Sequence, residues 1–262
     1  MADTAMSDSV RPDGPEDSED DPLAHAVWRL RSRGCWEDAA ALLEETAHHR
    51  AAPALHRAAL LVERCMYTSG GWTAAEEALR TAEALASSDD ERGAAACERG
   101  HLAYAATVLG VRDRTDEARA ALGRAAALIA PSAPARALLD LRRGLLAENL
   151  TDTPDSAQAA YLRAHSAATA RGDVLLSSST TRHLAGLALR SGETAEARQG
   201  FAESLRLREE AGFLVGMAPA LASLADVEPE SEAERLRTEA RRLIRLLGGV
   251  PAWLAARLEA EG

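Results

Sequence analysis

The sequence predicts an all-α fold in which about six antiparallel helical hairpins stack in a row and a last helix caps the end. A small residue recurs within the same local pattern every 36 to 43 residues, and a period of this order indicates a repeat array. Hydrophobic residues make up 47% of the chain and aromatic residues only 3%, which suits close-packed small helices better than a sheet. The recurring residues are Ala39, Ala75, Ala118, Ala157, Ala197 and Ala233.

Residues 1–21 predict a disordered acidic tail. The segment 1–22 holds eight acidic residues and one arginine, and it has too little apolar surface to offset the entropy of ordering. We interpret it as a solubilising tail; a tail that folds back and competes with a ligand is the alternative. Asp21 then caps the first helix, which Pro22 begins.

Helices are predicted throughout residues 22–247, because apolar and small residues recur three and four positions apart and so form one stripe along a helix face. The first helices of the pairs are predicted at 22–32, 53–68, 90–109, 134–149, 173–190 and 213–225. The second helices are predicted at 36–50, 72–86, 114–130, 154–170, 193–211 and 230–247.

Turn residues separate these helices. Gly34 and Gly192 supply the left-handed residue that ends a helix within a pair, and Pro53 and Pro134 mark breaks between pairs. Residues 248–262 predict a C-terminal capping helix. Its Trp253, Leu254 and Leu258 are expected to cover the last hairpin, since a repeat array needs an atypical end to stay soluble.

The segment GETAEARQGFAESLRLREEAGFLVGMAPALASLADV (192–227) resembles the tetratricopeptide repeat (TPR) family, in the long-helix form common in bacterial regulators. Residues 34–39 and 70–75 match locally, and the resemblance covers about 22–247. It implies a right-handed α-solenoid whose first helices line a concave groove. The chain departs from the family in having Leu184-Ala185 where Leu-Gly is expected, and its repeats exceed the usual length of about 34 residues.

By this resemblance, polar residues of the central first helices are the binding candidates. They are His101, Tyr104, Asp140, Arg142, Arg143, Ser179, Arg182 and His183. Arginine binds anions through a planar fork that makes two parallel charge-assisted bonds, so these residues predict a groove for a carboxylate, a phosphate or an acidic peptide. The alternative interpretation is that pairs such as Asp140–Arg143 and Glu98–Arg99 are mutual salt bridges along a solvated groove.

Several classes of function lack support in the sequence. It has no HExxH, P-loop, GxSxG or dinucleotide-binding glycine motif, and we expect neither a cofactor nor a metal. Outside the acidic segment 1–22 the net charge is −4, without the clustered cations that duplex nucleic acid requires. Neither a signal peptide nor a membrane span is expected, and Cys35, Cys65 and Cys97 are expected to be free thiols in a reducing cytoplasm.

The leading hypothesis is a protein- or peptide-binding module, interaction or regulatory, with an acidic or anionic partner. A ligand-sensing regulator that acts through another protein is the second hypothesis. The third is an unusual TPR-fold enzyme or small-molecule-binding protein of bacterial specialised metabolism that uses the same groove, with His101 and His183 as an acid–base pair. Whether the protein is an enzyme stays open, with the balance toward no, and self-association into a homo-oligomer also stays open.

Overall fold

A computed structural model describes residues 21–260 of the chain. Every regular element in this range is a helix and none is a strand, which confirms the predicted all-α class. Of the predicted acidic tail, residues 1–20 lie outside the described residues. The carboxylate of Asp21 accepts a hydrogen bond of 2.9 Å from the backbone nitrogen of Leu23, so the predicted cap and the start of the first helix are confirmed.

The helices alternate as first and second members of pairs. The first members are α1 (Pro22–Arg31), α4 (Ala51–Thr68), α6 (Asp89–Val108), α8 (Arg136–Asn149), α10 (Val174–Arg190) and α12 (Leu214–Ala225). The second members are α2 (Trp36–Leu42) with α3 (Glu44–Ala47), α5 (Trp72–Leu85), α7 (Thr115–Leu128), α9 (Pro154–Ala170), α11 (Thr194–Glu210) and α13 (Glu230–Leu246). The last helix is α14 (Ala252–Ala260).

One helix that was predicted to be continuous is interrupted in the structure. The segment 36–50 divides at Leu43 into α2 and α3, because the Leu43 nitrogen bonds to the carbonyl of Ala40 instead of continuing the helical ladder. The other predicted helices lie within a few residues of their observed bounds. Gly34 and Gly192 have φ angles of 80° and 84°, as their predicted role in ending helices requires.

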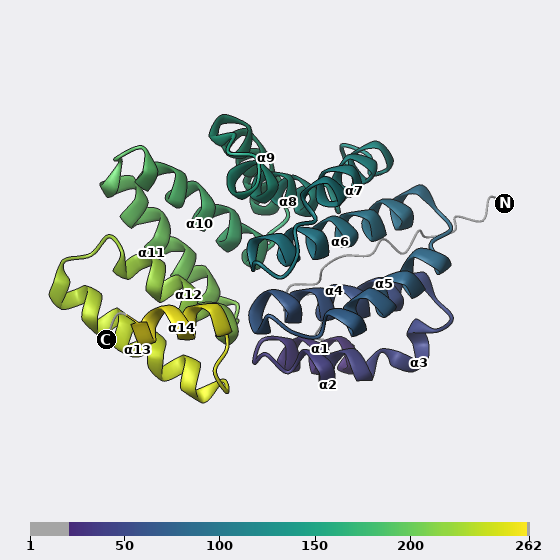
Figure 1. Cartoon of the computed structure of the whole chain (residues 1–262), viewed down its shortest axis with the longest axis horizontal. Coiled ribbons are helices and arrows are strands. Elements are labelled where there is room, and N and C mark those ends of the chain that lie inside the picture. The colour runs from purple at the N-terminus through teal and green to yellow at the C-terminus, as the bar shows by residue number, and fades with distance from the viewer. Residues whose placement is uncertain (1–20, 261–262) are drawn as a thin grey trace.

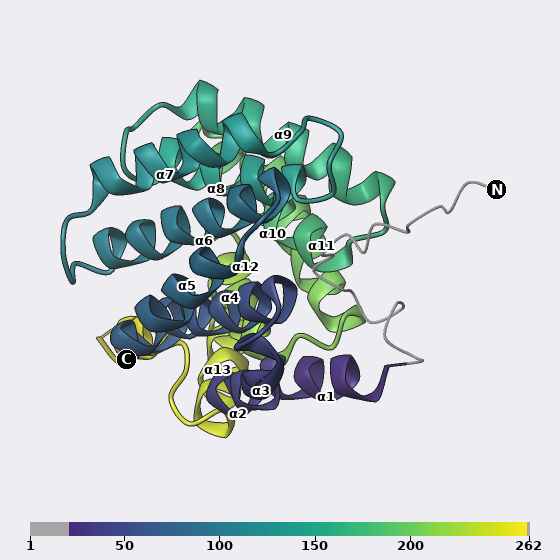
Figure 2. The ribbon, with the colours of Figure 1, turned by 90° about the vertical axis from the view of Figure 1, so that its right-hand side faces the viewer.

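Consecutive helices pack as hairpins, and consecutive hairpins pack on one another. Within pairs, α4 packs on α5, α6 on α7, α8 on α9, α10 on α11 and α12 on α13. Between pairs, α4 packs on α6, α6 on α8, α9 on α10 and α11 on α12. Figure 2 shows α4–α5, α6–α7 and α9 as successive layers. The right-handed superhelical sense stays a prediction.

The recurring alanines explain this close packing. Ala39, Ala75, Ala118, Ala157 and Ala197 are 0% exposed and Ala233 is 1% exposed. Small side chains at these positions let neighbouring helices approach closely, while larger residues such as Tyr161 and Phe201 fill the space between the layers. The period seen in the sequence is therefore the period of the helix crossings.

Gly144 on α8 gives a test of this packing. A Cβ atom built on it would overlap the ring of Tyr161 on α9, which is 0% exposed. Gly144→Ala is expected to lower the free energy of unfolding by about 1–3 kcal/mol through overpacking, measured by urea denaturation. The matched control is Gly123→Ala in α7, where a Cβ meets nothing within 4 Å and about 0.5–1 kcal/mol of stabilisation is expected. Equal effects of the two changes would contradict the packing described.

The two ends of the array are in contact. Figure 1 shows the chain running from α1 around through α7–α9 and returning to α12–α14 beside α1 and α4. The backbone nitrogen of Val215 at the start of α12 donates to the carbonyl of Ser32 after α1 at 2.9 Å. The rings of Trp28 and Phe213 stack with centroids 6.0 Å apart, and the Arg31 guanidinium lies 5.6 Å and 5.7 Å from their respective centres. Helix α14 also packs against α4.

The prediction that three residues of α14 cover the last hairpin is met by two of them. Leu254 and Leu258 are 0% and 2% exposed and join the apolar cluster formed with α12 and α13. Trp253, however, is 37% exposed, so it covers the last hairpin much less fully than Leu254 and Leu258 do. Positions 254 and 258 share a helix face, whereas 253 is rotated away from it by about 100°.

Candidate ligand-binding site

We use the name inner cluster for five side chains, from helices that are distant in sequence, that are linked through the charge of Arg182. They are Tyr67 on α4, Tyr104 on α6, Arg182 and His183 on α10, and Arg208 on α11. Arg182 is central, because its charge acts on the pKa values of the other four. Burial raises the pKa of Tyr67 to about 12 and raises that of Tyr104 as well, so both hydroxyls keep their protons at neutral pH.

The two arginines of the inner cluster have no carboxylate partner among the described residues. Arg208 is 7% exposed; its Nε donates to the Ser178 hydroxyl at 2.9 Å and its Nη1 donates to the Gly216 carbonyl. Burial lowers its pKa to about 10, and the nearby charge of Arg182 acts in the same direction. Arg182 is half-buried, and its Nε donates to the Ser223 hydroxyl at 3.2 Å. Its Nη1 and Nη2 have no hydrogen-bond partner in residues 21–260.

This lack of acidic partners distinguishes Arg182 and Arg208 from comparable arginines. All other arginines of the described chain that are buried or half-buried have a carboxylate oxygen within 4.0 Å. They are Arg31, Arg57, Arg64, Arg99, Arg114, Arg136, Arg142, Arg237 and Arg241. A desolvated cation is costly without a counterion, so the inner cluster is the part of the fold that most favours a bound anion.

His183 is oriented by a buried carboxylate. Its Nδ1 lies 3.1 Å from Oε2 of Glu148, and its ring stacks on Tyr161 with centroids 5.0 Å apart. Glu148 also accepts hydrogen bonds from the Tyr161 hydroxyl at 2.5 Å and from Arg190 at 2.6 Å. Burial alone raises the pKa of Glu148, but the bonds from His183, Tyr161 and Arg190 outweigh it and lower the pKa to about 2.

The imidazole of His183 is neutral at pH 7, because burial lowers its pKa more than the bond to Glu148 raises it. An ionised Glu148 assigns the proton to Nδ1, which donates to the carboxylate. Nε2 has no hydrogen-bond partner in the described chain and is a free acceptor. An oriented imidazole with a free nitrogen can take up a proton from a bound molecule.

His101 and Tyr104 share a helix face, as their spacing predicted. Their rings are stacked with centroids 6.2 Å apart and an angle of 20° between the planes. The Tyr104 hydroxyl accepts a hydrogen bond of 3.0 Å from Nδ2 of Asn149, which leaves its own proton available to a ligand. Burial, followed by the charge of Arg142, lowers the pKa of His101 well below its ordinary value.

Arg142 does not line a groove. Its side chain is 7% exposed; Nη2 bonds to Glu98 at 2.7 Å and Nη1 to the sulfur of Cys97 at 3.1 Å. The predicted Glu98–Arg99 pair is also wrong, because Arg99 pairs with Glu76 and Glu83 instead. Adjacent residues of a helix point in different directions, so Glu98 and Arg99 face different neighbours.

The predicted Asp140–Arg143 pair is likewise wrong. Asp140 pairs with Arg136 and Arg163, and Arg143 is exposed and has no ion-pair partner in residues 21–260. Positions 140 and 143 lie on the same side of α8 and position 142 lies on another, so spacing permits an Asp140–Arg143 pair. The pair is absent because Arg136 and Arg163 bind the Asp140 carboxylate instead. The hydroxyl of Ser179 donates to the carbonyl of Leu175 in its own helix. The eight predicted residues therefore do not form one site.

Sequence reasoning omitted Tyr67 and Arg208 from the candidate residues. Arg208 lies on a second helix, whereas the family resemblance directs attention to first helices only. Tyr67 lies on a first helix at the start of the chain and meets the others because the two ends of the array approach one another. No spacing within the sequence encodes that approach.

Two other features of residues 21–260 bear on the earlier expectations. These residues contain no group of three or more His, Cys, Asp or Glu side chains placed to hold a metal ion. None of their helices combines the length and the apolar character needed to cross a membrane. The cysteines are free thiols; Cys65 and Cys97 are buried, while Cys35 is half-buried at the start of α2.

Comparison with protein-family models and with curated proteins finds no match to this chain.

Proposed function

We propose that the protein is a peptide- or protein-binding module, built as a right-handed TPR-like α-solenoid, whose inner cluster binds an acidic group of its partner. The observation that carries the proposal is Arg182, a half-buried arginine with no carboxylate partner in the described chain. The bond from its Nε to Ser223 orients the guanidinium. Nη1 and Nη2 remain for the two oxygens of a carboxylate, the geometry of the strongest arginine–anion contacts.

The neighbours of Arg182 strengthen this preference. Arg208 adds a second cation, and the protonated hydroxyls of Tyr67 and Tyr104 supply neutral donors. The neutral His183 adds no negative charge, and the carboxylate of Glu148 is already satisfied by three donors. The net charge of −11 disfavours nucleic acid as the partner, and the sequence has no catalytic motif that would point to a turnover reaction.

The test uses fluorescence anisotropy with a labelled ten-residue peptide of alternating Glu and Ala. Wild-type protein is expected to bind it, and Arg182→Gln to weaken binding by about tenfold or more, since hydrogen bonds to charged groups contribute about 1.5–3 kcal/mol each. Arg143→Gln, which removes an exposed and unpaired arginine, is the matched control and should leave the affinity unchanged. Equal losses in the two variants, or equal affinity for a Gln–Ala peptide, would refute the proposal.

One observation favours a second candidate function, proton transfer on a bound small molecule. It is the Glu148–His183 pair, which fixes the imidazole and leaves Nε2 without a hydrogen-bond partner in the described chain. Native mass spectrometry of the protein purified from its source separates the two candidates. A co-purified peptide or protein supports the binding module, and a co-purified small molecule supports the proton-transfer site.

A further inference from the structure

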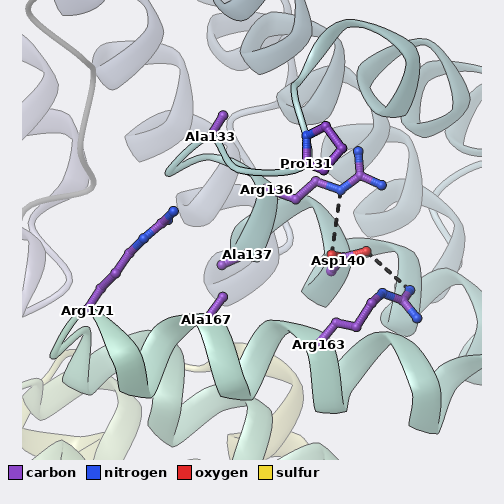
Figure 3. Close-up of a pocket in the computed structure, with 8 residues that line it drawn as sticks. All are labelled: Pro131, Ala133, Arg136, Ala137, Asp140, Arg163, Ala167 and Arg171. Atoms are coloured by element: carbon purple, nitrogen blue, oxygen red, sulfur yellow. Dashed lines mark hydrogen bonds and ion pairs between the residues drawn. The ribbon is translucent and has the colours of Figure 1, made fainter.

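A pocket between α8 and α9 lies about two helical turns along α8 from Glu148 and is separate from the inner cluster. Its volume is about 230 Å³, equal to roughly seven or eight water molecules at about 30 Å³ each. Figure 3 shows Arg136 and Arg163 beside Asp140 at one end and Arg171 at the other, with Ala137 and Ala167 between them. The pocket thus has a cationic group at each end and an apolar middle.

The first end carries a net positive charge. The carboxylate of Asp140, only 4% exposed, pairs with Nε of Arg136 at 3.6 Å and with Nη2 of Arg163 at 3.2 Å. Two guanidinium groups and one carboxylate leave a net charge of +1. Nε and Nη1 of Arg163 have no hydrogen-bond partner in residues 21–260 and are free to donate.

The second end carries a positive charge that forms no ion pair within the described residues. Arg171 donates from Nη1 to the carbonyl of Pro134 at 2.6 Å and from Nη2 to that of Ser132 at 3.3 Å. It has no carboxylate partner in the part of the chain that the structure describes, and its Nε is unbonded. Carbonyl groups fix the guanidinium without neutralising it, so little conformational freedom is lost when an anion binds.

We infer that this pocket binds a small linear dianion, an α,ω-dicarboxylate, with one carboxylate at each cationic end. Arg163 and Arg171 are eight residues apart along α9 and its C-terminal end, which corresponds to about 12 Å of helix. The methylene groups of the ligand lie over Ala137 and Ala167, where no polar side chain competes. A single carboxylate would leave one of the two cationic ends without a counterion.

The inference is tested by isothermal titration calorimetry at fixed ionic strength with succinate, adipate and suberate, and with hexanoate as a monocarboxylate of comparable length. At least one dicarboxylate is expected to bind about tenfold or more tightly than hexanoate, because it gains a second charge-assisted contact. Arg163→Gln and Arg171→Gln should each reduce that affinity to the level of hexanoate. Both side chains are exposed, so circular dichroism should show both variants folded.

Two further variants locate the binding. Arg143→Gln, on the same helix as Asp140 but outside the pocket, should leave the dicarboxylate affinity unchanged, and so should Arg182→Gln in the inner cluster. Three results would overturn the inference: no dicarboxylate exceeds hexanoate, Arg143→Gln causes the same loss, or only Arg182→Gln abolishes binding. The first two results are independent of whether the inner cluster binds an acidic peptide, and the third would place the dicarboxylate at the inner cluster instead of this pocket.

Discussion

Replacing Glu98 with glutamine is expected to lower the free energy of unfolding by about 3–5 kcal/mol. The substitution keeps the shape of the side chain but removes the charge that balances Arg142, which is 7% exposed and 2.7 Å away. Burial alone lowers the pKa of Arg142, but the charges of Glu98 and Cys97 and the hydrogen bonds to them together outweigh it and raise the pKa above its ordinary value. Without Glu98 the guanidinium is a buried charge with no counterion. Urea denaturation at pH 7, followed by circular dichroism, measures the loss.

Two control variants test whether the loss of stability in Glu98→Gln comes from leaving a buried charge without its counterion. Glu239→Gln breaks an ion pair with Arg242 on the surface of α13 and should change stability by less than about 1 kcal/mol. Changing both buried partners, Glu98→Leu with Arg142→Met, should recover most of the stability. Oε2 of Glu98 and Nε of Arg142 have no hydrogen-bond partner, so an apolar pair gives up little at these atoms. A Glu98→Gln loss no larger than that of Glu239→Gln would contradict the expectation.

Acidification from pH 7 to pH 5 is expected to destabilise the protein, by at most about 1.4 kcal/mol per pH unit for each of His101 and His183, starting near pH 6.5. Burial lowers the pKa of both histidines in the folded state. Arg142 acts in the same direction on His101, as do Arg182 and Arg208 on His183. The unfolded chain therefore takes up protons below pH 6.5 that the folded chain does not. The contribution of the two histidines to the free energy of unfolding is complete above pH 6.5 and is lost progressively as the pH falls below it.

Glu148 extends the loss to more acidic pH. The pKa of its carboxyl falls from 4.5 to about 2 on folding, so its contribution is present above pH 4.5 and disappears as the pH falls toward 2. Urea denaturation at intervals between pH 7 and pH 2 measures both effects. His101→Gln and His183→Asn should each reduce the slope between pH 6.5 and 5, and the double variant should reduce it further. An unchanged slope in the double variant would show that neither histidine is the source.

The all-α class and the helix bounds could be predicted from sequence because their determinants are local. Each of the six recurring alanines lies within a few residues of the glycine or cap that begins its helix, so the spacing of these alanines alone places the helices. The break at Leu43 could not be predicted, since no glycine or proline marks it. His101 with Tyr104, and Arg182 next to His183, are likewise local pairs, and the structure keeps each pair together.

The rest of the site depends on contacts between distant segments. Asp140, Arg142 and Arg143 are close in sequence but have unrelated partners. Asp140 pairs with a residue of α9 and Arg142 with a residue of α6. Arg143 has no ion-pair partner among the described residues. Which neighbour a helix face meets depends on how the hairpins are rotated against one another, and the apolar stripe specifies only the face that is buried. Arg208 joins Tyr67 because α11 and α4 approach across the fold, more than a hundred residues apart in the chain.

The contact between Ser32 and Val215 changes how the molecule is expected to come apart. In an open array each repeat touches only its neighbours, so terminal repeats fray first and unfolding can proceed inward from a free end. Here α1 is held by the start of α12, and α14 by α4, so fraying at either terminus must also break contacts with the opposite one. The chain should therefore melt as a single cooperative unit, with its terminal helices protected from hydrogen exchange to nearly the same degree as its central ones.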